Sequence, residues 1–277
     1  MCRLYGFRAN EPTKVECTLV YAQNALLTQS RADLRGTSHP DGWGIAYYDD
    51  GGPQVERRDT AAYADLHFSV TAERMYARTV LAHVRRATIG GATAVNTHPF
   101  TDGHWSVAHN GTVRGFEEVG PQLERETHPD LLTRRLGNTD TELVFYWLLS
   151  RMVAGGVDLR GPADRRRLED AVRQAVVCLE RRCQLAEPGK PAQLNLVITD
   201  GTVLVASCWR HSLHWVQRLG VHDCEICGIP HIRHRPGLDY RAVVVASEPI
   251  SHEAWETLPD GSILSVGPDA RGAVQRI

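Results

Sequence analysis

The first hundred or so residues alternate short apolar runs with turn-forming residues, a pattern typical of β-strands joined by tight loops. We expect strands at Cys2–Phe7, Trp43–Tyr48, Val80–Val84 and His104–His109. After the first of these runs, the apolar period lengthens to three and four residues. This change predicts a helix from about Thr13 to Leu27.

Two longer helices are predicted in the middle of the chain. The segment Thr139–Glu142 matches a capping box, in which the threonine caps the helix start and the glutamate lies three positions later. The helix that follows carries apolar residues at helical spacing and ends at Gly155-Gly156. A second amphipathic helix is expected from about Ala163 to Gln184, with arginines mostly on its polar face.

β-Structure returns after these helices. Asp200-Gly201 lies between two β-prone runs and predicts an antiparallel hairpin, because Asp-Gly suits tight hairpin turns. Arg241–Ser247 and Ser262–Val266 are expected to be closing strands. Strands, then helices, then antiparallel strands favour an α+β layered domain over a parallel doubly wound sheet. We expect one domain over residues 2–277, with a loop insertion at about 220–237.

Charge and composition narrow the choice of partner. The 277 residues carry a formal net charge of −2, too little to recruit nucleic acid or acidic membranes by bulk electrostatics, so we expect neither as a partner. No apolar run approaches the length of a membrane span, and five charged side chains in the first twenty residues leave no signal-peptide core. Seven scattered cysteines, an odd number, argue for a reducing, cytoplasmic setting.

The most reactive candidate is Cys2, which only Met1 precedes. If Met1 is removed, one residue carries both a thiol and a free α-amine. The ordinary pKa values of these groups lie at about 8.5 and 7.7–8.0, so either exchanges a proton close to neutrality. The thiolate is the reactive form, and an adjacent base helps to make it. On position alone, chance is the favoured explanation for a cysteine here.

Several short clusters offer groups that such a nucleophile needs. Arg85 ends a predicted strand and could hold a carboxylate through its fork of donors. Asp140, at a helix start, could hold the matching ammonium. The Asn110 amide and the Gly111 backbone N–H could stabilise an oxyanion. Taken singly, these are an ordinary surface arginine, a first-turn aspartate that favours the helix dipole and a common Asn-Gly turn.

Taken together and in order, the clusters resemble the class II glutamine amidotransferases, a family of N-terminal-nucleophile hydrolases. The motifs are Cys-Arg-Leu-x-Gly, Asp-Gly-Trp-Gly, His-x-Arg-x-Ala-Thr, Asn-x-His-Pro-Phe, His-Asn-Gly and Thr-Asp-Thr-Glu. The resemblance is densest over residues 2–150 and is nearest to the free-standing glutaminase-type branch, which includes the γ-glutamyl amidohydrolase of ergothioneine synthesis. It implies a four-layer αββα sandwich.

The resemblance also implies a role for each matching residue. Cys2 would attack the γ-amide of glutamine or of a γ-glutamyl derivative and form a thioester, with its own amine as base. Asn110 and Gly111 would form the oxyanion hole. The residues implied in substrate binding are Arg85, Thr88, His98 and Asp140. Arg86 departs from the family pattern, because relatives often carry an aromatic residue there.

The resemblance leaves alternatives open. No cofactor is implied for catalysis, and the small-molecule substrate is glutamine or a γ-glutamyl amide. Ammonia would be released or handed to a separate synthetase subunit. A catalytically silent regulatory or binding module on the same fold is the alternative to an enzyme.

The loop at about 220–237 offers a second candidate site. Cys224 and Cys227 are followed by His231 and His234, four ligands of the kind that a structural zinc ion takes. The two halves are unusually close in sequence, so the ion could instead recruit His222 or a distant ligand. A metal-free surface loop is the alternative.

Overall fold

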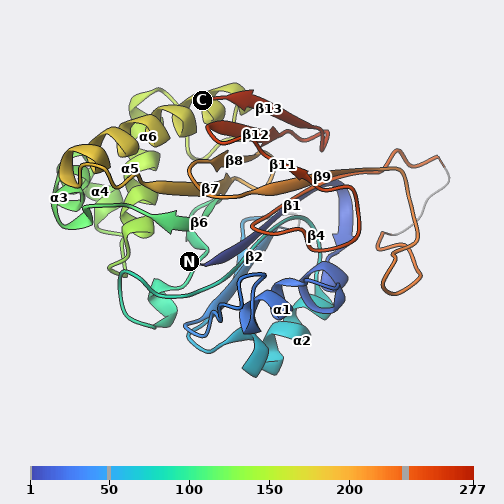
Figure 1. Cartoon of the computed structure of the whole chain (residues 1–277). Helices are drawn as coiled ribbons and strands as arrows, with labels where there is room; N and C mark the ends of the chain where they lie inside the picture. The colour runs from blue at the N-terminus through green and yellow to red at the C-terminus, as the bar shows by residue number, and fades with distance from the viewer. Residues whose placement is uncertain (1, 49–50, 233–236) are drawn as a thin grey trace.

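Two antiparallel β-sheets lie face to face in the computed structural model, with helices on both outer surfaces (Figure 1). The structure describes residues 2–48, 51–232 and 237–277. The predicted α+β class and the four-layer αββα sandwich are thereby confirmed. No described helix is both long and apolar enough to cross a membrane.

The first sheet has the strand order β11-β9-β10-β1-β4-β2-β3. Its strands are β1 (Arg3–Lys14), β2 (Trp43–Tyr48), β3 (Gln54–Arg58), β4 (Tyr76–Val84), β9 (His214–Leu219), β10 (Arg241–Ala246) and β11 (Glu256–Thr257). The helices before β4 are η1 (Cys17–Tyr21), α1 (Leu26–Arg31), η2 (Ala62–Ala64) and α2 (Leu66–Arg74). The outer face of this sheet is covered by α1 and α2 (Figure 1).

The second sheet has the order β13-β12-β8-β7-β6-β5. Its strands are β5 (Phe100–Asp102), β6 (Trp105–Thr112), β7 (Gln193–Thr199), β8 (Leu204–Cys208), β12 (Ser262–Val266) and β13 (Gly272–Arg276). The remaining helices are η3 (Ala94–Asn96), α3 (Phe116–Glu126), α4 (Pro129–Leu132), α5 (Asp140–Ala154) and α6 (Arg165–Ala186). Helices α3, α5 and α6 cover its outer face (Figure 1).

Three apolar layers hold the four structural layers together. Tyr5 and Phe7 point from β1 toward the outer helices, while Leu4 of the same strand faces the second sheet. Leu4 packs in one cluster with Val197 and Leu264 of that sheet. Because β1 is buried on both faces, its start is fixed between the two sheets, where Cys2 enters the fold.

The predicted helix from about Thr13 to Leu27 is wrong. Strand β1 continues past an irregularity in its register, and Thr13 and Lys14 pair with the start of β4. The short η1 and α1 follow instead. Val15 and Leu19 are buried as their spacing suggested, so the periodicity located the apolar face but not the backbone that presents it.

The other predicted elements agree with the structure to within a few residues. Asp200-Gly201 lies in a β7–β8 hairpin whose turn is held by the Asp200 carboxylate, which accepts from the Thr202 and Val203 N–H groups at 2.8 Å each. At the start of α5 the Thr139 hydroxyl caps the Glu142 N–H at 3.2 Å. The Glu142 carboxylate does not complete the box, because it accepts from the Leu136 and Gly137 N–H groups.

Candidate active site

Strand pairing brings Cys2 to the end of β4. Arg3 is the register partner of Val84, so the preceding residue Cys2 lies beside Arg85 and Arg86. The Cys2 Sγ is 3.4 Å from both the backbone nitrogen and the carbonyl oxygen of Arg86. The Arg86 side chain is exposed, so this departure from the family pattern contributes to the described site through its backbone.

A small hollow of about 20 Å³ opens beside the Cys2 thiol. The predicted residues that line it are Cys2, Arg85, Thr88, His98, Gly111 and Asp140. Its other lining residues are Arg86, Ile89, His109, Thr139 and Thr141. Its volume is close to that of one water molecule, so binding of a glutamyl group requires the lining residues to move apart.

Arg85 is buried beside the hollow and holds the loop that follows β4. Its Nη1 donates to the Gly91 carbonyl at 2.8 Å, and its Nη2 donates to the carbonyls of Ile89 and Gly90 at 3.0 and 3.2 Å. Arg85 therefore fixes the loop as well as bringing positive charge to the hollow. A guanidinium has five N–H donors, so the fork keeps capacity for a substrate carboxylate.

Asp140, the first residue of α5, brings negative charge to the same hollow. Its Oδ2 accepts from the Val113 N–H at 3.1 Å, and its Oδ1 accepts from the Thr141 N–H at 2.8 Å. These bonds orient a carboxylate that is only 7 % exposed. Arg85 and Asp140 thus place opposite charges around one hollow, as an α-amino acid requires.

Gly111 borders the hollow and Asn110 lies beneath it. A Cβ at Gly111 would lie 1.8 Å from the Gln193 carbonyl oxygen, so no other residue fits this β6 position without displacing backbone. The buried Asn110 Nδ2 donates to the Ser247 hydroxyl at 2.9 Å. An amide nitrogen carries two N–H groups, so the Ser247 bond orients the amide and leaves a second donor. Asn110 is the predicted site residue that the structure does not place on the hollow's surface.

His98 lines the hollow and packs against a second buried histidine, His83. The His98 ring stacks on His83 with centroids 4.2 Å apart and contacts Phe100 at 4.7 Å. Burial lowers the pKa of His98 well below its usual range and that of His83 to about 3. Neither His98 ring nitrogen has a hydrogen-bond partner among the described residues. His98 therefore offers a neutral polar edge to the hollow, not a charge.

The environment of Cys2 favours the protonated thiol. Burial is the largest influence and raises its pKa, although the residue keeps some exposed surface. The N–H of Arg86 and the positive charge of Arg85 act in the opposite direction. A thiol that stays protonated near neutrality needs a base to accept its proton during attack.

Sequence reasoning missed a buried network that holds the Cys2 backbone. Arg3 donates to the Cys2 carbonyl at 2.8 Å and forms ion pairs with Asp33 and Glu248 at 2.5 and 3.0 Å. His39 contacts the same Asp33 oxygen at 3.1 Å. Asp33 and Glu248 lie 30 and 245 residues from Arg3, so no local pattern in the sequence pointed to them.

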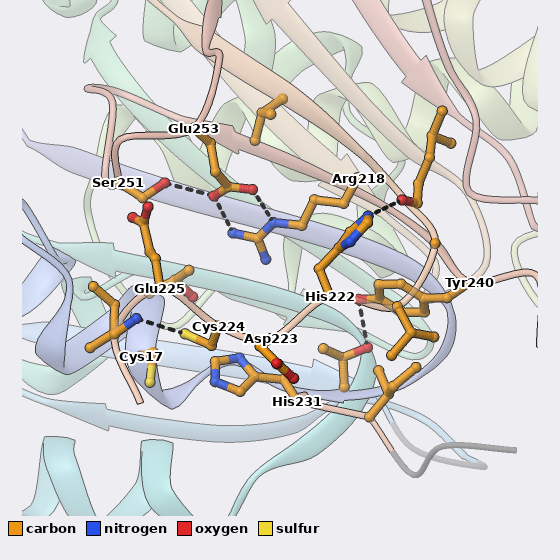
Figure 2. A pocket seen from close by; sticks show the side chains of 18 of the residues that line it. Cys17, Arg218, His222, Asp223, Cys224, Glu225, His231, Tyr240, Ser251 and Glu253 are labelled. Carbon is orange, nitrogen blue, oxygen red and sulfur yellow. Dashed lines mark hydrogen bonds and ion pairs between the residues drawn. The ribbon is translucent and has the colours of Figure 1, made fainter. Parts of the chain in front are cut away.

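The second candidate site lies elsewhere in the fold. Cys224, Cys227 and His231 come together as predicted, whereas His234 lies outside the described residues. Cys17 of η1 joins them, which the sequence did not indicate. A cavity of about 680 Å³ adjoins this cluster, and Figure 2 shows Cys17, Cys224 and His231 along one side of it. Although it is the larger cavity, Cys2 does not line it.

The αββα sandwich is the fold of the N-terminal-nucleophile hydrolases. In this chain a half-buried thiol lies just before a central strand of that fold. The chain belongs to the class II glutamine amidotransferases: the family model "Glutamine amidotransferases class-II" matches residues 1–275. The resemblance stated from the motifs is therefore confirmed.

Named relatives span nearly the whole chain. The probable glutamine amidotransferase DUG3 of Saccharomyces cerevisiae is 28% identical and aligns over 96% of this chain and 82% of its own length. The γ-glutamyl-hercynylcysteine sulfoxide hydrolase of Mycobacterium tuberculosis is 27% identical, over 96% of this chain and 93% of its own. A predicted glutamine amidotransferase from Pseudomonas aeruginosa has the same fold, with a TM-score of 0.63, 23% identity and full coverage of both chains. The relatives are named as glutamine amidotransferases or as a γ-glutamyl hydrolase, which confirms the prediction that this chain is an enzyme of the amide-hydrolase class.

Proposed function

We propose that this protein hydrolyses the γ-amide of a γ-glutamyl compound, glutamine or a γ-glutamyl derivative, through a thioester at Cys2. The observation that carries the proposal is the single hollow in which the thiol, Arg85 and Asp140 meet. A glutamyl group has an α-carboxylate, an α-ammonium and a γ-carbonyl. The residues that line the hollow include a candidate partner for each, with Arg85 for the carboxylate and Asp140 for the ammonium.

The reaction proceeds in two balanced steps. The Cys2 sulfur bonds to the γ-carbon while its proton passes to the Cys2 α-amine, which is free once Met1 has been removed. The oxyanion is stabilised by the Gly111 N–H and by the Asn110 amide that Ser247 orients. The ammonium then protonates the leaving amine, which departs with the C–N electron pair. Water adds to the thioester, and glutamate leaves as the thiol reforms.

The site recognises the glutamyl part and not the amine. Arg85 and Asp140 address the two α-substituents, so glutamine and substituted γ-glutamyl amides use the same contacts. The Mycobacterium tuberculosis relative is named for hydrolysis of a γ-glutamyl-hercynylcysteine sulfoxide, which supports testing substituted amides first. The released amine or ammonia leaves freely or passes to a synthetase subunit. A reducing, cytoplasmic setting keeps the Cys2 thiol reduced.

The test is labelling with a glutamine-mimicking diazoketone followed by peptide mapping. Protein whose mass shows that Met1 is absent should be modified at Cys2, with loss of hydrolysis. Labelling should fail in Asp140→Ala and Arg85→Ala. The matched control is Cys178→Ser, which removes another half-buried thiol, on α6, and should label as the unaltered protein does.

Two results contradict the proposal. One is modification of another residue, or of none, in Met-free protein. The other is retention of Met1 in protein made in cells, because the base would then be missing. Either result favours the catalytically silent regulatory or binding module.

A further inference from the structure

Four side chains from two distant parts of the chain converge beside the 680 Å³ cavity. They are Cys17, Cys224, Cys227 and His231, and their ligand atoms all lie within 4.8 Å of one another. Cys227 Sγ and His231 Nε2 are already 3.2 Å apart. All three cysteines are free thiols.

These separations suit a tetrahedral ion. A Zn–S bond of about 2.3 Å places two sulfurs of a tetrahedron about 3.8 Å apart. No separation in the cluster exceeds that edge by more than about 1 Å, a contraction within reach of rotation about the cysteine side chains. Three thiolates and one imidazole match a known zinc ligand set and favour soft metals over calcium or magnesium.

The Cys224–Gly228 turn has the backbone that a zinc knuckle uses. The Gly228 N–H donates to the Cys224 carbonyl at 2.8 Å, and Gly228 has a φ of +73°, which glycine adopts without strain. The Ile226 N–H points at the Cys224 sulfur from 3.4 Å. A backbone donor to a sulfur stabilises its thiolate form and orients it toward a metal.

The other two ligands are positioned by the end of β1. The His231 carbonyl accepts from the Lys14 N–H at 2.8 Å, and Ile232 forms an isolated bridge with Thr13. Cys17 follows three residues after Lys14, as the first residue of η1, and is 4 % exposed. The strand that carries Cys2 at one end therefore brings Cys17 and His231 together at the other.

We propose that Cys17, Cys224, Cys227 and His231 bind one zinc ion that fastens the β9–β10 loop to the end of β1. Four protein ligands fill a tetrahedral ion and leave no open position for water or substrate, so the site is structural. Cys17 takes the place that the sequence gave to His234. The loop segment that carries Cys224 and His231 also lines the cavity, so the ion would fix one of its walls.

The experiment measures zinc in the full chain purified without chelator and, separately, after reconstitution with zinc under reducing conditions. The unaltered protein should hold about one zinc per chain. Cys17→Ser and Cys227→Ser should each lose most of it. Cys178→Ser and His234→Ala should keep it. Circular dichroism checks that the variants are folded, and Cys227→Ser is informative even if Cys17→Ser is not, because Cys227 is exposed.

A cobalt-substituted sample supplies an independent readout. Tetrahedral thiolate coordination gives strong visible absorption, which Cys17→Ser should weaken and Cys178→Ser should leave unchanged. Less than about a tenth of an equivalent of zinc after reconstitution would overturn the proposal. So would a disulfide between two of these cysteines in fresh protein, or loss of zinc from His234→Ala but not from Cys17→Ser. None of these outcomes depends on amide hydrolysis.

Discussion

A cysteine lies beyond each end of strand β1, and the two cysteines have different surroundings. Before its first residue lies Cys2, a single thiol surrounded by Arg85, Asp140 and backbone donors. Shortly after its last residue lies Cys17, which faces two further cysteines and a histidine. The two ends of β1 pair with the two ends of the nine-residue β4, so they lie roughly 25 Å apart at about 3.3 Å per residue.

The difference shows that neighbours, and not the thiol itself, decide what a cysteine does. At the Cys2 end the charges match an amino acid, and the lone sulfur can form a bond to carbon. At the Cys17 end three sulfurs crowd together, and a cation is the simplest partner that stabilises them all as thiolates. The following experiments alter one end and measure both.

Removing the nucleophile should give the largest effect. Cys2→Ala should lower kcat for amide hydrolysis by at least about 10⁴-fold, because the thioester cannot form. Its zinc content and melting temperature should match those of the unaltered protein. Release of glutamate measures the first quantity, and metal analysis with thermal unfolding measures the others. Residual hydrolysis above a tenth would show that another group attacks.

Weakening the ammonium partner should give the next largest effect. Asp140→Asn keeps the shape but loses the charge, so kcat/KM for glutamine should fall about 10- to 100-fold, the range for a hydrogen bond to a charged group. Hydrolysis of 4-carbamoylbutanoate, which is glutamine without its α-amino group, should change little. Equal losses on both substrates would mean that Asp140 acts through the structure of α5 and not through the ammonium.

Most residues that the sequence singled out around Cys2 line one hollow, because each belongs to a local motif. Strand ends and helix starts place Arg85, Gly111 and Asp140, and each lies within a short motif. The Asn110–Ser247 hydrogen bond joins residues 137 positions apart, so no local pattern around Asn110 predicts it.

The Cys17 end was predicted only in part. Cys224, Cys227 and His231 are close in sequence, so their spacing indicated a metal. Cys17 arrives because β1 continues past its irregularity and pairs with β4. Apolar spacing reports which side chains are buried, and it favoured a helix over a segment that tertiary pairing holds extended. Because the segment was predicted to be a helix, Cys17 was not recognised as the fourth candidate ligand.

The buried histidines near Cys2 should make the protein sensitive to acid. The folded pKa of His83 is about 3, below the value of about 6.5 for an unfolded chain. The neutral form is therefore favoured by folding, and its stabilisation is complete above about pH 6.5 and lost as pH falls toward 3. His83 alone should account for about 2 kcal/mol of the free energy of unfolding lost by about pH 5.

Denaturant unfolding at several pH values checks this prediction. His83→Gln should flatten the slope of stability against pH by about 1.4 kcal/mol per unit in that range. His39, whose pKa burial lowers to about 4, acts in the same direction and remains in the variant. An unchanged slope in His83→Gln would contradict the neutral state assigned to His83.

Loss of the Ser247 hydroxyl should have a smaller effect on catalysis. Ser247→Ala removes the acceptor that orients Asn110, so kcat should fall about fivefold, the value of one net hydrogen bond of about 1 kcal/mol. KM should stay the same if the amide acts on the oxyanion. The matched control is Ser106→Ala, which removes another buried hydroxyl, on β6, that is bonded to the Tyr48 hydroxyl; it should lower stability without lowering kcat.

Removing the metal should have the smallest effect on hydrolysis. Chelator treatment, or Cys227→Ser, should leave kcat/KM within about twofold, because β1 and its partners hold the Cys2 end without the β9–β10 loop. The same treatment should increase proteolytic cleavage of that loop, since its tether to Cys17 is gone. Cleavage rates followed by mass spectrometry, beside glutaminase assays on the same samples, compare the ends directly. A parallel loss of hydrolysis would show that the two ends of β1 are coupled and that the ion does more than fasten a loop.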